Sequence, residues 1–177
     1  MGEGLRLLKI TVVRGKTLVI RDFKSSDPYV VVKLGNQNVS MIHLTVYQTA
    51  KTRVINSCLN PVWNEELNFT LTEPLGFLNL EVFDKDVWKA DDKMGKSYLN
   101  LQPLVSAARL RDILGSSCGE TALRKVMPER DNCLVRESII KNNVNGEVVQ
   151  NVWLRLDGVE SGELELTIKL ITPVASS

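Results

Sequence analysis

Apolar and polar residues alternate along most of the chain with a period of two. Leu164, Leu166 and Ile168, for example, are separated by single polar residues. This alternation is typical of a β-strand that packs one face on a core and exposes the other to water. Strand-like segments separated by turn-forming residues occur at residues 8–12, 29–34, 49–55, 67–71, 78–82, 96–101, 152–156 and 164–170. The pattern predicts an all-β fold, an eight-stranded antiparallel β-sandwich.

Residues 103–150 interrupt this rhythm between the sixth and seventh predicted strands. Four apolar residues there fall on one arc at 3.6 residues per turn: Ala107, Leu110, Ile113 and Leu114. They predict a short helix with Pro103 near its start and Gly115 as its C-cap. Farther on, Asn145-Gly146 favours a type I′ turn, so we expect a small hairpin that leads into the seventh strand. The insertion is too long for a passive connection and predicts a functional loop or an added subdomain.

Composition narrows the function classes. With 22 basic and 21 acidic side chains in 177 residues, the net charge of +1 argues against a nucleic-acid-binding protein. A hydrophobic fraction of 44% fits one globular domain over residues 1–177. No transmembrane segment or signal sequence is apparent, so we expect a cytoplasmic protein. Three cysteines without a Cys-x-x-Cys pair, and His43 as the one histidine, offer little for a zinc site or a catalytic triad.

Aspartates gather in two segments that each follow or precede a predicted strand. Asp22 and Asp27 lie in the first segment, and residues 84–92 hold four more. If both loops open at one end of the sandwich, the carboxylates repel one another unless a hard cation neutralises them. Ca²⁺ prefers six to eight oxygen ligands in a flexible arrangement. The pattern therefore suggests a calcium site, although aspartate is also common in turns, where it caps the local backbone.

At these residues the chain resembles the C2 domain, a calcium- and phospholipid-binding β-sandwich. The matching motifs are Ser26-Asp27-Pro28-Tyr29-Val30, Asn60-Pro61-Val62-Trp63-Asn64-Glu65, Leu80-Glu81-Val82-Phe83-Asp84-Lys85-Asp86 and Asp92-Lys93-Met94-Gly95, together with residues 5–15. The resemblance implies that five aspartates ligate calcium: Asp22, Asp27, Asp84, Asp86 and Asp92. Asp91 matches no such position, and we interpret it as a solvated neighbour.

The insertion narrows the resemblance further. Its segments Val126-Met127-Pro128, Asp131-Asn132-Cys133-Leu134 and Glu137-Ser138 are similar to those of the plant C2-domain abscisic-acid-related proteins, which carry a signature insertion in a single C2 domain. This resemblance implies calcium-dependent attachment to anionic phospholipids at the plasma membrane and recruitment of pyrabactin-resistance-like abscisic acid receptors. It also implies the nucleus as an alternative location. Some relatives are described as GTPase-activating proteins, but no residue here identifies itself as an arginine finger or a catalytic base.

The chain departs from the family pattern in one segment. Residues 38–48 are about eleven extra residues at a strand connection, as a splice variant would produce. His43 lies within them and is interpreted as an incidental loop residue. Because the cost of loop closure grows slowly with length, we expect the sandwich to tolerate this insert.

Two sets of residues are candidates for membrane contact. Phe23, Val87 and Trp88 lie between the candidate calcium ligands, where exposed apolar side chains fit the membrane interface. Alternatively, Trp88 folds back over its own loop. Lys51 and Arg53 are two apart on a predicted strand and can share a face that binds phosphoinositide headgroups, with Lys33 nearby. The alternative for this pair is an ordinary solvated strand face.

Three functions remain open on the sequence alone. The leading prediction is a non-enzymatic module that binds Ca²⁺ and anionic phospholipids, while its insertion presents a surface to a receptor. The second is a GTPase-activating protein, or a regulator of a small GTPase, that its C2 domain localises. The third is a scaffold that does not need calcium.

Overall fold

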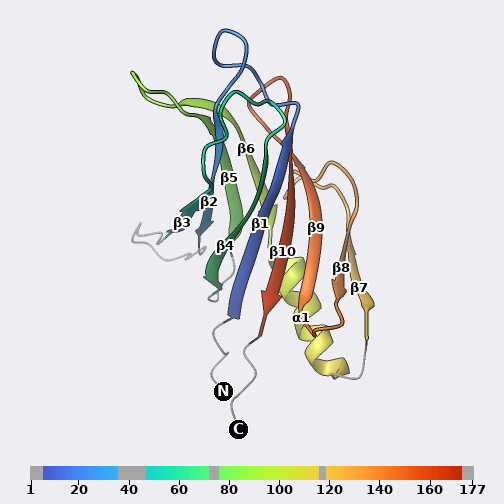
Figure 1. The fold of residues 1–177 in the computed structure, drawn as a ribbon. Helices are drawn as coiled ribbons and strands as arrows, with labels where there is room; N and C mark the ends of the chain where they lie inside the picture. Colours follow the sequence, from blue (N-terminus) through green and yellow to red (C-terminus); the bar gives the residue numbers. More distant parts are fainter. Residues whose placement is uncertain (1–5, 36–46, 72–75, 116–118, 173–177) are drawn as a thin grey trace, which may run out of the picture.

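The computed structural model describes residues 6–35, 47–71, 76–115 and 119–172, and it is built almost entirely of β-strands (Figure 1). The elements are β1 (Arg6–Lys16), β2 (Pro28–Gly35), β3 (Tyr47–Lys51), β4 (Val62–Leu71), β5 (Phe77–Asp84), β6 (Asp92–Asn100), α1 (Gln102–Leu114), β7 (Thr121–Val126), β8 (Ser138–Asn142), β9 (Val148–Arg155) and β10 (Glu163–Ile171). One sheet has the order β4-β1-β10-β9-β8-β7, and the other has the order β3-β2-β5-β6.

The alternating pattern in the sequence becomes the inner faces of the two sheets. In β1, Leu8, Ile10 and Val12 are fully buried, and β10 pairs with this strand in antiparallel register. The facing sheet contributes the alternate residues of β2 and β5, such as Val30 and Leu80. Because each strand buries every second side chain, one apolar layer between the sheets holds the fold together. The predicted all-β sandwich is confirmed.

The eight predicted strands correspond to β1–β6, β9 and β10, and two further strands widen the first sheet. β8 pairs with β9 through Ile140↔Gln150, and β7 pairs with β8. β7 escaped prediction because none of its residues is buried, so its sequence shows no alternation. β3 ends at Lys51, earlier than the predicted strand 49–55. Most of the insert 38–48 lies outside the described residues.

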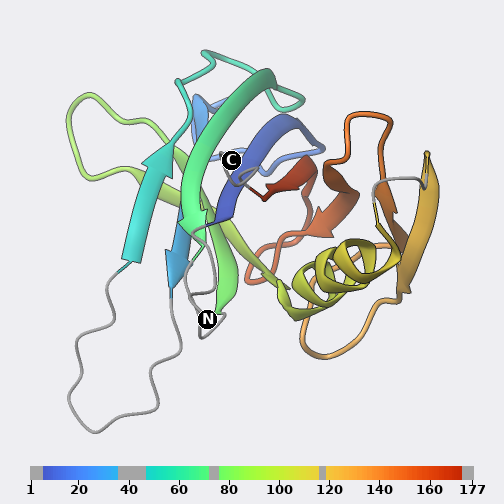
Figure 2. The ribbon, with the colours of Figure 1, turned by 90° about the horizontal axis from the view of Figure 1, so that it is seen from below.

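The helix forms where it was expected but buries a different face. Gly115 is its C-cap with φ of 80°, and its N–H donates to the Arg111 carbonyl, as predicted. Of the four residues on the predicted arc, only Ala107 is buried, whereas Leu110, Ile113 and Leu114 are exposed. The buried residues are Leu104, Val105, Ala107 and Ala108. Figure 2 shows α1 beside β7, β8 and β9, and Figure 1 shows that its C-terminal end lies below the ends of these strands.

The predicted hairpin connects β8 and β9, but its turn is not type I′. A type I′ turn needs positive φ at both central residues, and here Gly146, at 75°, has positive φ while Asn145 does not. The Gly146 N–H donates to the Asn143 carbonyl, and the Asn143 N–H donates to the Glu147 carbonyl. This pattern is a type I turn followed by a glycine bulge. The Arg111 guanidinium donates to the Gly146 carbonyl, which joins the turn to α1.

The candidate calcium loops and the C-terminal end of α1, which belongs to the insertion, lie at opposite ends of the molecule. Figure 1 shows the connections 17–27, 84–91 and 156–162 at the upper end of the sandwich, whereas the C-terminal end of α1 lies at the lower end. The arrangement follows from the antiparallel strands, because alternate connections of such a sheet open at the same end. One end can therefore contact a surface while the other remains accessible.

The corrected helix face gives a stability prediction. Leu104→Ala removes a fully buried side chain and should lower the free energy of unfolding by about 2–5 kcal/mol. Ile113→Ala, in the same helix, removes a side chain that is 81% exposed and should change the free energy by less than about 0.5 kcal/mol. Urea denaturation of both variants measures the difference. Equal losses would mean that the second half of α1 also packs on the sandwich.

Candidate functional site

Asp84 is the last residue of β5 and stands at the centre of the candidate site. Its side chain is only 3% exposed, and its Oδ1 accepts a hydrogen bond of 2.6 Å from the Asp27 N–H. Asp27 in turn accepts a bond of 2.6 Å from the Ser57 N–H. Asp84 also pairs across the sheet with Asp92, the first residue of β6. Backbone geometry therefore brings the first loop and the start of β6 to Asp84, and brings Ser57 to Asp27.

The electrostatics at Asp84 are unfavourable in the absence of a cation. Burial raises the pKa of the Asp84 carboxyl above its ordinary value, and the negative charges of Asp22 and Asp27 raise it further. The hydrogen bond from the Asp27 backbone acts in the opposite direction but does not cancel these effects. A carboxylate that is both desolvated and close to like charges is costly to keep ionised. Asp22, Asp27 and Asp84 thus form one electrostatic group.

Asp86 and Asp92 form a second group, which a lysine bridges. The Lys89 Nζ lies 2.7 Å from Asp92 Oδ2 and 3.5 Å from Asp86 Oδ2. Asp86 also accepts a hydrogen bond of 3.0 Å from the Trp88 N–H, and this bond together with Lys89 holds the pKa of Asp86 below its ordinary value. Sequence reasoning missed Lys89, whose only signal was its position among the aspartates.

Asp91 is a structural member of the same loop. The interpretation of Asp91 as a solvated neighbour is wrong, because its carboxylate accepts bonds from the Tyr29 hydroxyl at 2.5 Å and the Asp86 N–H at 3.0 Å. Lys85 adds an ion pair of 3.2 Å. The Asp86 N–H and the Tyr29 hydroxyl hold the pKa of Asp91 below its ordinary value. Asp91 therefore fixes the start of the loop that carries Asp86.

The donor set fits a hard divalent cation, although its members are not gathered around one point. Among the described residues, no three acidic, histidine or cysteine side chains lie close enough together to hold a metal ion. The structure instead divides the five aspartates between the Asp84 group and the Lys89 bridge. All five supply carboxylate oxygens, and the raised pKa of Asp84 is of the kind that an added positive charge would lower.

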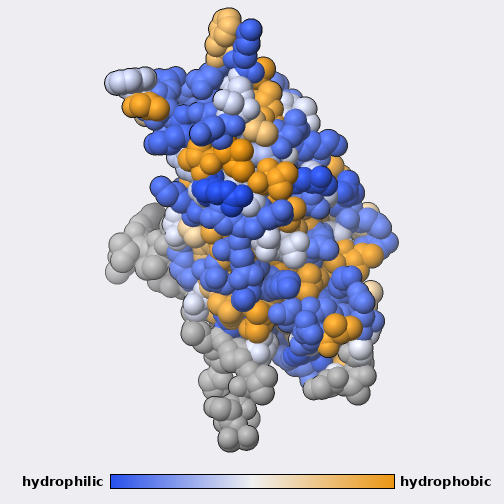
Figure 3. All heavy atoms as spheres, viewed as in Figure 1, coloured by the Kyte–Doolittle hydropathy of each residue, from blue (hydrophilic) through white to orange (hydrophobic). Residues whose placement is uncertain are grey.

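The candidate membrane residues are exposed at the same end. Phe23 is 93% exposed, Trp88 is 94% exposed and Val87 is 80% exposed. Figure 3 shows apolar atoms at the extremity of the uppermost loop and just below the pale extremity at the upper left, with hydrophilic atoms around them. Trp88 does not fold back over its own loop. Large apolar side chains held this far into solvent are typical of a contact surface.

Two of the three basic residues predicted to bind headgroups, Lys33 and Arg53, are paired with carboxylates. Lys51 and Arg53 flank buried Thr52 and are both exposed, but Arg53 lies 3.6 Å from Glu65, and Lys33 Nζ lies 2.5 Å from Glu81. A groove of about 490 Å³ crosses this sheet, and its lining includes Lys33, Thr49, Lys96 and Tyr98. Lys51 and Arg53 do not line it. The cations that line the groove are therefore Lys33, which is already paired, and Lys96, and headgroup binding at Lys51 and Arg53 stays a prediction.

Comparison with known proteins places the chain in a family. The family model for the C2 domain matches residues 6–114. The protein named C2-DOMAIN ABA-RELATED 11 from Arabidopsis thaliana is 64% identical over 98% of this chain and 97% of its own length. GTPase activating protein 1 from rice is 40% identical over 97% of this chain and 94% of its own length. The chain belongs to the C2 domain family and, within it, to the C2-domain abscisic-acid-related proteins.

Solved structures support the same fold. A single C2 domain of plant extended synaptotagmin 1 superposes with a TM-score of 0.59 at 21% identity and covers 99% of this chain and 100% of its own. The calcium-bound pair of C2 domains of extended synaptotagmin 2 also gives a TM-score of 0.59, at 24% identity over 94% of this chain and 45% of that one. In the described part of the chain, no helix is both long enough and apolar enough to cross a membrane.

The strained charge at Asp84 gives a prediction for the metal-free protein. Asp84→Asn keeps an oxygen that can accept the Asp27 N–H but removes the buried charge, so it should raise the urea midpoint in a chelator at pH 7. Since the folded state favours protonated Asp84, the gain should shrink as the pH falls through its raised pKa.

Asp112→Asn serves as the control, because Asp112 is paired with Arg111 away from the loops. This control should not raise the midpoint. A lower midpoint for Asp84→Asn would show that the carboxylate stabilises the metal-free fold.

Proposed function

We propose that this protein attaches to anionic phospholipid membranes in response to calcium and there recruits abscisic acid receptors. The observation that carries the proposal is the buried, mutually repelling carboxylate group at Asp84, which lies at the same end as exposed Phe23 and Trp88. Membership of the C2 family supports it, as does the calcium-bound extended synaptotagmin 2 structure. The function is a binding function, and no catalytic residue is assigned.

The residues of the chain have separate parts in this proposal. Asp22, Asp27, Asp84, Asp86 and Asp92 would hold calcium, which supplies positive charge and open coordination positions for lipid phosphates. The hydrogen bonds to Asp27 and Asp84 position these carboxylates before any metal arrives. Lys89 forms ion pairs with Asp86 and Asp92. If calcium takes these carboxylates, the Lys89 ammonium would be released beside Trp88 and would be free to contact anionic headgroups. Phe23, Val87 and Trp88 would enter the interface.

The carboxylates can be tested in a vesicle assay. Asp84→Asn combined with Asp86→Asn should abolish calcium-dependent sedimentation with phosphatidylserine vesicles, because the charge that holds the metal is lost. Wild-type binding should weaken at high salt. Asp112→Asn is the matched control and should bind like the wild type. Sedimentation of the double variant at the wild-type calcium midpoint would remove these residues from the site.

The apolar tip gives an independent prediction. Trp88→Ala should weaken calcium-dependent vesicle binding on the order of tenfold, since burial of one large apolar side chain is worth about 1.5–3 kcal/mol. Calcium affinity in solution, measured by calorimetry without vesicles, should stay the same because the carboxylates are intact. Ile113→Ala, which removes an exposed apolar residue at the other end, should leave both measurements unchanged. A comparable loss in both variants would argue against insertion of the loop.

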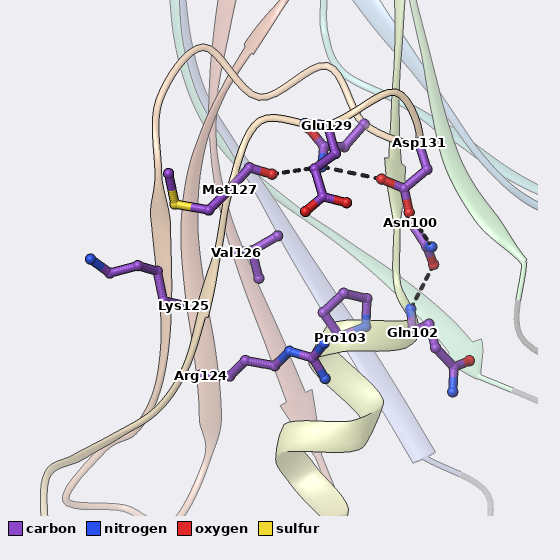
Figure 4. A pocket seen from close by; sticks show the side chains of 10 residues that line it. Asn100, Gln102, Pro103, Arg124, Lys125, Val126, Met127, Glu129 and Asp131 are labelled. Carbon is purple, nitrogen blue, oxygen red and sulfur yellow. Dashed lines mark hydrogen bonds between the residues drawn. The ribbon is translucent and has the colours of Figure 1, made fainter.

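The insertion is the proposed receptor surface. A hollow of about 250 Å³ lies between the start of α1 and β7, and its lining includes Pro103, Arg124, Val126 and Glu129. Figure 4 shows the Arg124 guanidinium and the Glu129 carboxylate directed into this space from opposite sides. Among the described residues neither has an ion-pair partner. The lining is mostly polar, and unpaired charges of both signs within it are suited to a protein contact.

Receptor binding should therefore separate from membrane binding. Arg124→Glu should weaken binding to a purified pyrabactin-resistance-like receptor by about tenfold or more while calcium-dependent vesicle binding persists. Lys9→Glu makes the same charge change within β1, outside the insertion and away from the 17–27 loop, and should retain both activities. Surface plasmon resonance for the receptor and sedimentation for vesicles provide the two measurements. Parallel loss of both in a folded Arg124→Glu protein would contradict separate surfaces.

GTPase activation is the alternative function, and the name of the rice relative favours it. In this alternative, the protein would accelerate GTP hydrolysis by a small GTPase, and its C2 fold would localise it. A GTP hydrolysis assay with a candidate GTPase, with and without this protein, distinguishes the two functions. Acceleration that persists in the Asp84→Asn and Asp86→Asn double variant would assign GTPase activation to this chain independently of lipid.

A further inference from the structure

Besides the groove lined by Lys33 and Lys96, a separate pocket with cationic residues lies where the edge strand β6 meets the turn between β9 and β10. Its volume is about 240 Å³. Arg21, Lys93 and Lys96 line it, together with residues 157–159 of the turn. The two segments are joined by reciprocal backbone bonds, Lys96 N–H to the Asp157 carbonyl at 3.1 Å and Asp157 N–H to the Lys96 carbonyl at 2.7 Å. The pocket is therefore fixed by backbone on both sides.

The carboxylates at this pocket are already paired with other groups. Glu81 Oε2 accepts from Lys33 Nζ at 2.5 Å. Asp157 Oδ1 accepts from Arg155 Nε at 3.2 Å, and its Oδ2 lies 3.5 Å from the Cys133 thiol. Arg21, Lys93 and Lys96 have no acidic partner within ion-pair distance among the described residues. The three cations therefore outnumber the two carboxylates that line the hollow, and each of those carboxylates is already paired with another cation.

The arginine is the most firmly held of the three cations. Arg21 Nε donates to the Lys93 carbonyl at 3.0 Å, and the Arg21 N–H donates to the Ser26 hydroxyl at 2.8 Å. Its guanidinium is therefore oriented before a ligand binds, while the two lysines are exposed and can adjust. One oriented guanidinium with two mobile ammonium groups suits a tetrahedral oxyanion, because phosphate accepts several charge-assisted hydrogen bonds at once.

We propose that Arg21, Lys93 and Lys96 form a binding site for a phosphate group that operates without calcium. The phosphate can belong to a lipid headgroup or to a free phosphate ion, since both present the same oxygens. The site shares no side chain with the candidate calcium ligands and does not depend on the calcium function proposed above. Gly95 shapes it, because a Cβ there would lie 2.8 Å from Val159 and 2.9 Å from Leu156.

The test titrates the full-length protein with inorganic phosphate in a chelator at constant ionic strength. The backbone amide NMR signals of Gly95 and Gly158, which line the pocket, report binding. Arg21→Gln combined with Lys93→Gln should weaken saturable binding by about tenfold or more, since two charge-assisted hydrogen bonds are lost. Lys16→Gln combined with Lys125→Gln removes the same net charge elsewhere and should leave the affinity within about twofold, a shift worth less than about 0.5 kcal/mol.

Vesicles identify the source of the phosphate. Sedimentation in chelator with vesicles of phosphatidic acid in phosphatidylcholine should fall in the Arg21 and Lys93 variant, but not in the control variant, if the ligand is a lipid headgroup. Saturable phosphate binding without vesicle binding would assign the site to soluble phosphate. Phosphate shifts that do not saturate, together with equal vesicle binding by the two variants, would overturn the proposal. None of these outcomes depends on the aspartates that serve calcium.

Discussion

The hydrogen bond between the Asp27 backbone and the Asp84 carboxylate is the constraint on which the upper end of the molecule depends. It ties the end of the first loop to the end of β5 at a point that water hardly reaches. The same contact holds like charges together, so the loops are ordered and electrostatically strained at once. In the proposed calcium site, this arrangement would trade stability of the fold for affinity toward a cation.

The two ends of the sandwich present different surfaces because the antiparallel strands separate them. Charged and apolar side chains gather in the upper loops, whereas the insertion adds β7, β8 and most of the helix away from them. The added strands continue an existing sheet, so they need no second core. Arg136 of the insertion stacks on Trp153 of β9 from 5.3 Å, and Arg14 of β1 stacks on the same ring. These contacts bind the insertion to the rigid part of the fold.

The fold was largely predictable because alternation directly records which side chains face the core. The predictions of buried residues failed where burial depends on how far a helix or strand extends past the rest of the sandwich. Ile113 lies on the apolar arc of α1 but is exposed because the helix runs past the sheet, and β7 has no buried face to record. At the site, the sequence indicated the aspartates, but not Lys89 and Asp91. Their roles depend on how the 84–91 loop folds back, and no residue pattern specifies that path. Calcium binding itself stays a prediction.

The three tryptophans occupy three distinct environments, which makes the chain its own optical reporter. Trp63 is buried and donates its indole N–H to the Arg53 carbonyl, Trp153 lies between two guanidinium groups, and Trp88 stands free in solvent. Indole fluorescence shifts to shorter wavelength as water is removed from the ring. Of these three rings, Trp88 alone has nearly all of its surface left to lose. A spectral shift on contact with a partner or a vesicle would therefore report on the 84–91 loop without any attached dye.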